Sequence, residues 1–201
     1  MELYKFLLWQ TLILLKIVHP SFEINYEYVF LDENVFNSCP DPPPGFSDVH
    51  KLFDLSELNS EIKPDGLHIS GNITIVWDVQ PTDRIEGRIS VLHLDRGSWQ
   101  PTILNIWTYD FCKIFNDQKQ VWYNSFVKYI VNKNDTEKCF NNKGTVYYVE
   151  PYVMNAIFGA GMRPPPGLNR IVFTLSAVDE NNVKRPNGIC FEITGEFVRQ
   201  T

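Results

Sequence analysis

Residues 66–79, GLHISGNITIVWDV, decide the fold class, because apolar and polar residues alternate along them. The odd positions from Leu67 to Val79 are apolar or glycine, whereas the even positions are mostly polar. A period of two residues is typical of a β-strand with one buried face and one face in water. The stretch therefore predicts a strand over 67–79 whose buried face lines either a solid core or a cavity.

Similar short apolar runs recur along the chain, separated by turn signals rich in Pro, Gly, Asn and Asp. Together they predict about seven to nine strands, and the one clear helical spacing of apolar residues lies in 118–131. This pattern favours an all-β, antiparallel sandwich or cup with one short α-helix. A chain of 201 residues is long enough to build one such domain.

The N-terminal residues have the composition of a secretory signal peptide. Residues 6–15 form an apolar run that Lys16 interrupts. A membrane-spanning helix needs about 18 to 20 apolar residues, so this run is too short to span. We predict a signal peptide over 1–21 and a single secreted domain over 22–201, with an uncleaved anchor as the alternative.

The cysteines and two glycosylation motifs agree with secretion. The 4 cysteines are Cys39, Cys112, Cys139 and Cys190. An even number behind a signal peptide predicts two disulfides, and the spacing leaves all three pairings open. Two Asn-x-Thr motifs, which begin at Asn72 and Asn134, predict N-glycosylation of a protein in the secretory pathway.

The sequence contains no motif that points to catalysis, a cofactor or a metal. The three histidines that follow the predicted signal peptide, His50, His68 and His93, form no metal-binding pair. We expect no enzymatic activity, although scattered Ser, His and Asp residues leave a spatial triad as an alternative. The net charge of −6 gives no support to nucleic-acid binding, which requires clustered Lys and Arg.

Large apolar side chains on the predicted strand faces are the candidates for a ligand-binding interior. They are Ile73, Ile75, Trp77, Trp107, Phe173, Leu175, Phe191 and Ile193. The same residues suit a solid core equally well, since periodicity does not show whether two sheets separate around a cavity.

Five segments resemble the insect chemosensory protein A family: 69–83 (ISGNITIVWDVQPTD), 95–102 (DRGSWQPT), 110–113 (DFCK), 184–186 (KRP) and 189–196 (ICFEITGE). The resemblance extends over nearly the whole predicted mature chain. This family is distantly similar to the ML lipid-recognition superfamily, which includes the ganglioside activator protein and mite group allergens. The resemblance implies an immunoglobulin-like β-cup that holds lipid between two sheets.

The resemblance also implies a cysteine pairing and a function. Carried over from the ganglioside activator protein, it pairs Cys39 with Cys190 and Cys112 with Cys139. It implies a secreted protein that carries or presents a lipid-like ligand, associated with taste or pheromone perception. The alternative is an extracellular cofactor of a receptor or ion channel that acts through surface loops without a ligand cavity.

Overall fold

The computed structural model describes residues 24–33 and 35–200. The predicted signal peptide over 1–21 lies outside these residues. No helix in the described part of the chain is long and apolar enough to cross a membrane.

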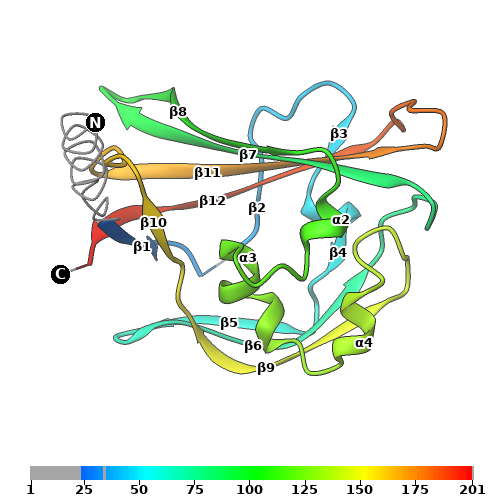
Figure 1. Cartoon of the computed structure of the whole chain (residues 1–201). Helices are drawn as coiled ribbons and strands as arrows, with labels where there is room; N and C mark the ends of the chain where they lie inside the picture. Colours follow the sequence, from blue (N-terminus) through cyan, green and yellow to red (C-terminus); the bar gives the residue numbers. More distant parts are fainter. Residues whose placement is uncertain (1–23, 34, 201) are drawn as a thin grey trace, which may run out of the picture.

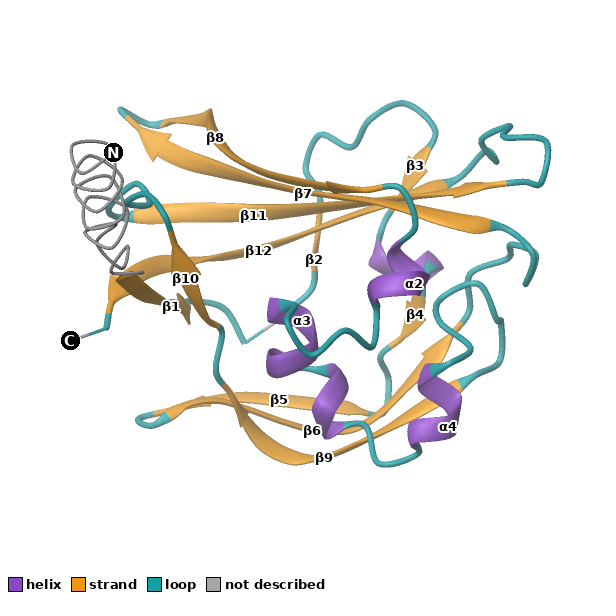
Figure 2. Ribbon diagram, in the orientation of Figure 1, coloured by secondary structure: helices purple, strands orange, loops and turns teal. Residues whose placement is uncertain are grey.

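The described chain forms two β-sheets that face each other, with short helices at their side and between them (Figure 1; Figure 2). Sheet A has eight strands in the order β10-β1-β12-β11-β7-β8, with β2 and β3 also paired to β12. Sheet B has four strands, in which β6 pairs with β4, β5 and β9. The predicted all-β sandwich is confirmed, and the strands outnumber the prediction because three of them contain only two residues.

The strands of sheet A are β1 (Ile24–Phe30), β2 (Asn37–Ser38), β3 (Phe46–Ser47), β7 (Arg84–Asp95), β8 (Ser98–Thr108), β10 (Ile157–Ala160), β11 (Leu168–Val178) and β12 (Gly188–Arg199). The strands of sheet B are β4 (Phe53–Asp54), β5 (Leu58–Lys63), β6 (Gly66–Ile75) and β9 (Val146–Met154). The helices are η1 (Val49–Lys51), α2 (Phe111–Ile114), α3 (Val121–Ser125), η2 (Val127–Tyr129) and α4 (Lys133–Thr136).

The alternation in residues 66–79 produces the central strand of sheet B. Leu67, Ile69, Ile73 and Ile75 of β6 are each at most 3% exposed and face sheet A. The strand ends at Ile75 rather than at residue 79, so the predicted C-terminal boundary was four residues too long.

Between Cys112 and Cys139, several short helices take the place of the single helix that the sequence predicts over 118–131. The helix α3 ends at Ser125, whose Oγ donates to the carbonyl oxygen of Val121 at 2.8 Å. The next residue, Phe126, leaves the α region with φ −143° and ψ −61°, and a single 3-10 turn follows. A side-chain hydroxyl that bonds to the preceding turn weakens a helix, and here the helix ends at that residue.

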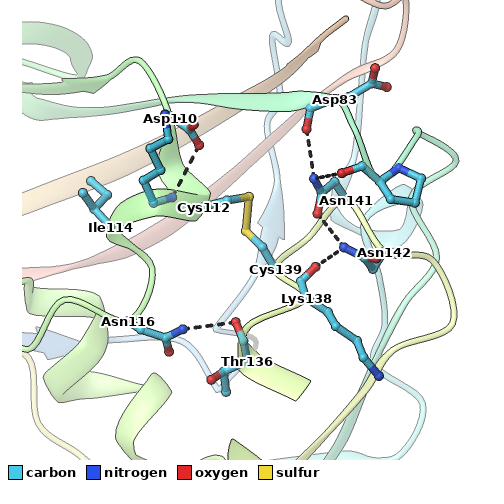
Figure 3. The surroundings of a disulfide bond; sticks show 12 residues. Asp83, Asp110, Cys112, Ile114, Asn116, Thr136, Lys138, Cys139, Asn141 and Asn142 are labelled. Atoms are coloured by element: carbon cyan, nitrogen blue, oxygen red, sulfur yellow. Dashed lines mark hydrogen bonds and ion pairs between the residues drawn. A yellow bond between two sulfur atoms is a disulfide. The ribbon is translucent and has the colours of Figure 1, made fainter. Parts of the chain in front are cut away.

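The two disulfides join Cys39 to Cys190 and Cys112 to Cys139, which are the pairs that the resemblance implies. The first attaches the segment around β2 to β12. The second closes the helical insert between Cys112 and Cys139, in which Asn116 donates to the carbonyl oxygen of Thr136 (Figure 3). Just after the insert, Asn141 donates to the carbonyl oxygen of Asp83. The insert supplies Phe115 and Ile130 to the core, which are 1% and 0% exposed.

Candidate functional site between the sheet edges

Most of the predicted ligand-binding residues belong to the packed core. Ile73 and Ile75 are 1% and 0% exposed, so protein atoms surround them and they border no space for a ligand. Leu175 and Phe191 are buried as well. Trp77 lies beyond the end of β6, and its Nε1–H donates to the carbonyl oxygen of Asn187 at 3.2 Å.

The prediction that Trp107 faces the interior is wrong, because its side chain is 62% exposed. In the ladder between β7 and β8, Trp107 lies opposite Arg88, and the buried Gly87 lies opposite Thr108. Neighbouring residues of a strand point to opposite faces, so Trp107 shares the outer face of sheet A with Arg88. Alternation places a residue on one of two faces but does not say which face is covered.

Two predicted residues, Phe173 and Ile193, are only half-buried although they lie on the inner face of central strands. Phe173 stacks on Phe191 with ring centroids 4.7 Å apart and an interplanar angle of 6°. Phe36 in turn contacts Phe191 edge-on, with centroids 5.6 Å apart. An aromatic row therefore extends from the inner face of sheet A to the segment that precedes β2.

At the outer end of this row, a depression of about 610 Å³ opens to solvent between the edges of the two sheets. One wall comes from the segment around β2 in sheet A, and the other from β4, β5 and the loop between them in sheet B. The lining residues are Val35, Phe36, Asn37, Ser38, His50, Asp54, Leu55, Ser56, Leu58 and Ser60. Small-molecule pockets typically measure about 300–1,000 Å³, so this depression has the size of a ligand site.

The floor of the depression is apolar and its rim is polar. Val35, Phe36, Leu55 and Leu58 form or pack against the hydrophobic core, and they are the apolar part of the lining. On the rim, hydrogen bonds from the backbone N–H and the side chain of Ser56 hold the pKa of Asp54 below its usual value. The carboxylate is therefore ionised at neutral pH, and the rim carries negative charge beside an apolar floor.

Sequence reasoning missed the residues that line the depression. Phe36 and Leu55 lie in irregular segments outside the strands, and Leu58 begins an edge strand with no regular apolar alternation. Two strand-like signals reach these residues: the segment 22–36, which ends at Phe36, and the spacing of Phe53 and Leu55. In the structure β1 ends at Phe30 and β4 ends at Asp54, so both Phe36 and Leu55 lie outside the strands.

A second depression, of about 300 Å³, lies on the outer face of sheet B beside the predicted glycosylation site Asn72. The Nδ2 of Asn72 donates to Glu57 Oε2 at 2.8 Å, and Asp54 and Ser56 line both depressions. The other predicted acceptor, Asn134, is exposed in α4.

The histidines lie in different places. His50 is exposed at the rim, and His68 lies 2.8 Å from Asp65 on the surface of sheet B. His93 lies opposite Asn169 on the ladder between β7 and β11. Within residues 24–33 and 35–200, no three His, Cys, Asp or Glu side chains are grouped as metal ligands would be.

The sequence was compared with models of protein families and with curated proteins, and neither comparison gave a match.

Proposed function

We propose that this chain is a secreted binding protein that carries or presents a lipid-like hydrophobic ligand at the depression between β2 and β5. The observation that carries the proposal is the apolar floor, which continues through Phe36 and Phe191 to the half-buried Phe173. Two disulfides are compatible with an extracellular protein. The resemblance to the chemosensory protein A family supports a role in insect taste or pheromone perception.

Binding at this depression would depend mainly on removal of apolar surface from water. Each CH₂ group that is buried contributes about 0.8 kcal/mol, so an alkyl chain needs few polar contacts. The polar rim would stay in water and would favour a ligand whose polar end remains at the mouth.

A matched pair of variants on β5 tests the location of the site. Ser60 lines the depression, and Asn59 is exposed on the opposite face of the same strand. Ser60→Trp should fill the space and weaken binding of an uncharged fluorescent fatty-ester probe at least about tenfold, which equals about 1.4 kcal/mol. Asn59→Trp adds the same side chain outside the depression and should bind the probe as the wild type does.

Native mass spectrometry of the secreted wild-type protein, followed by lipid extraction, tests the function itself. We expect a co-purifying apolar ligand or saturable binding of the probe. A wild-type protein that carries no lipid and binds no probe would contradict the proposal and favour an extracellular cofactor that acts through its surface. If Ser60→Trp binds as tightly as the wild type, ligand binding stands but its location does not.

A further inference from the structure

The depression on the outer face of sheet B contains a predicted glycosylation motif in its wall. It measures about 300 Å³ and is lined by Asp54, Ser56, Glu57, Asn72, Thr74, Val146 and Tyr148. Asn72 and Thr74 are the first and third residues of the Asn-x-Thr motif on β6. The first sugar of a glycan on Asn72 would therefore start inside this depression, and the covalent bond would keep it there.

An aromatic ring lies directly beside this motif. In the ladder between β6 and β9, Tyr148 is the partner of Asn72. The neighbours of Tyr148 in the strand, Tyr147 and Val149, are 0% and 5% exposed, so they point into the core and Tyr148 points outward. Directly opposite residues of a strand pair have Cβ atoms about 4.5–5.5 Å apart. Tyr148, which is 48% exposed, therefore lies within reach of the first sugar on Asn72.

Hydrogen bonds to Glu57 hold the Asn72 side chain from the other edge of β6. The Nδ2 of Asn72 donates to Glu57 Oε2 at 2.8 Å, and its backbone N–H donates to the carbonyl oxygen of Glu57 at 3.0 Å. In N-glycosylation, Nδ2 bonds to C1 of N-acetylglucosamine, C1 releases the lipid diphosphate that carried it, and Nδ2 loses one proton. Because Glu57 holds one N–H of Nδ2, the sugar would replace the other, which lies on the side of Tyr148.

The lining matches both kinds of surface of an N-acetylglucosamine residue. The C–H groups on one face of the sugar ring suit the electron-rich face of an aromatic ring such as Tyr148. The hydroxyl and acetamido groups need hydrogen-bond partners, and the Thr74 hydroxyl and the Asp54 carboxylate line the same depression. A volume of about 300 Å³ is at the lower end for ligand pockets, which suits one sugar rather than a longer saccharide.

We propose that this depression is an intramolecular binding site for the first N-acetylglucosamine of a glycan on Asn72, with the sugar stacked on Tyr148. Covalent attachment gives the sugar a high effective concentration at the site, so contacts that are too weak to bind a free sugar are sufficient. The stacked sugar covers apolar surface of Tyr148 and connects β6 to β9, so it stabilises sheet B. The inference requires glycosylation of Asn72 and does not depend on the proposed ligand binding.

A protein that carries a single sugar on Asn72 tests the proposal. Asn134→Gln removes the other predicted acceptor, and secretion with a mannosidase inhibitor followed by endoglycosidase H leaves one N-acetylglucosamine, which mass spectrometry verifies. In the NMR spectrum, the sugar ring protons should lie upfield of those of N-acetylglucosaminyl-asparagine, because they lie over the Tyr148 ring. Tyr148→Phe keeps an aromatic ring and should keep this shift, whereas Tyr148→Leu should abolish it.

Urea unfolding of the same proteins gives the second measurement. With tyrosine or phenylalanine at position 148, loss of the sugar through Asn72→Gln should raise the unfolding equilibrium constant about fivefold more than it does in the Tyr148→Leu background. This factor equals about 1 kcal/mol, which is typical of one aromatic contact. Equal effects in all backgrounds overturn the proposal. So does a secreted protein without a glycan on Asn72, or a sugar on Asn72 whose ring protons show no upfield shift beside Tyr148, whether or not Tyr148→Leu folds.

Discussion

At the scale of single residues, the best-defined polar interaction is the pair of Asp83 and Arg185. The Asp83 carboxylate is 0% exposed and accepts hydrogen bonds from Arg185 Nε at 3.0 Å and Nη2 at 2.9 Å. The backbone N–H of Gln80 donates to the same carboxylate. Burial alone would raise the pKa of Asp83, but these hydrogen bonds outweigh it and hold the pKa below its usual value.

We predict that Asp83→Asn lowers the free energy of unfolding by about 2 kcal/mol at pH 7, because it leaves the guanidinium without its charged partner. The folded-state pKa is below the unfolded value of about 3.9, so the stabilisation is present above that value. It is lost as the pH falls through the folded-state pKa. Urea unfolding of both proteins should therefore show a difference that narrows below about pH 4.

The exposed pair of Asp78 and Lys143 supplies the control. Their Oδ1 and Nζ atoms are 3.0 Å apart, but the Asp78 side chain is 90% exposed. Asp78→Asn should leave the unfolding free energy unchanged within error at pH 7 and below about pH 4, since solvent screens such pairs. Equal losses in the two variants would contradict the assignment of Asp83 as a stabilising buried partner.

Also at this scale, the sequence predicts the side-chain directions of a central strand but not those of an edge strand. Ile73 and Ile75 face the core as the alternation indicated, and Asn72 lies on the outer face. Trp107 follows the same alternation in β8, yet its face of the sheet is uncovered. Which face of a sheet is buried depends on the layer that packs against it, so the sequence of a single strand does not determine the buried face.

At the scale of elements, the insert between Cys112 and Cys139 is the part whose local structure depends most on tertiary contacts. Its helices have four or five residues, too few to be stable alone. The buried side chains of Phe115, Val127 and Ile130 hold it against the core. Helical periodicity in 118–131 was therefore a signal of burial on one side, and it overestimated the helix length.

We predict that replacing Cys112 and Cys139 together by Ser lowers the free energy of unfolding by up to about 3.5 kcal/mol. The disulfide closes a loop with a sequence separation of 27, and a cross-link of this length restricts the unfolded chain by about that amount. Chemical unfolding of the secreted double variant provides the measurement. Hydrogen exchange at the Ile130 amide, which donates to Val127, should also become faster.

The double variant of Cys39 and Cys190 is the comparison, with a sequence separation of 151. The same relation gives up to about 5 kcal/mol for this loop. Exchange at Ile130 should increase selectively in the Cys112 and Cys139 variant. Equal protection of Ile130 in both double variants would show that the disulfide of the insert does not hold its helices.

At the scale of the whole molecule, the sequence predicts two facing sheets, but not where they leave an opening. The floor residues Phe36 and Leu58 come from segments more than twenty positions apart, one just before β2 of sheet A and the other at the start of β5 of sheet B. Neither segment shows a periodic pattern, because short edge strands are shaped by their neighbours. Five of the eight predicted lining residues, Ile73, Ile75, Trp77, Leu175 and Phe191, are instead buried in the packed core.

The glycan predicted at Asn72 would lie beside the depression proposed as the ligand site. Asp54 and Ser56 border both the ligand depression and the depression that contains Asn72. A glycan on the Nδ2 of Asn72 would therefore begin at the rim of the mouth. The glycosylated amide keeps one N–H, so it can still donate to Glu57.

We predict that Asn72→Gln raises the association and dissociation rates of an apolar probe severalfold and leaves the dissociation constant unchanged. A glycan at the mouth obstructs passage in both directions but does not contact a ligand on the floor, so it alters rates rather than affinity. Stopped-flow fluorescence on protein secreted from insect cells measures both rates, and mass spectrometry verifies the loss of one glycan. Asn134→Gln removes a glycan from exposed α4, whose residues do not line the depression, and should leave the rates unchanged. Identical rates in the wild type and Asn72→Gln would show that the glycan does not reach the mouth.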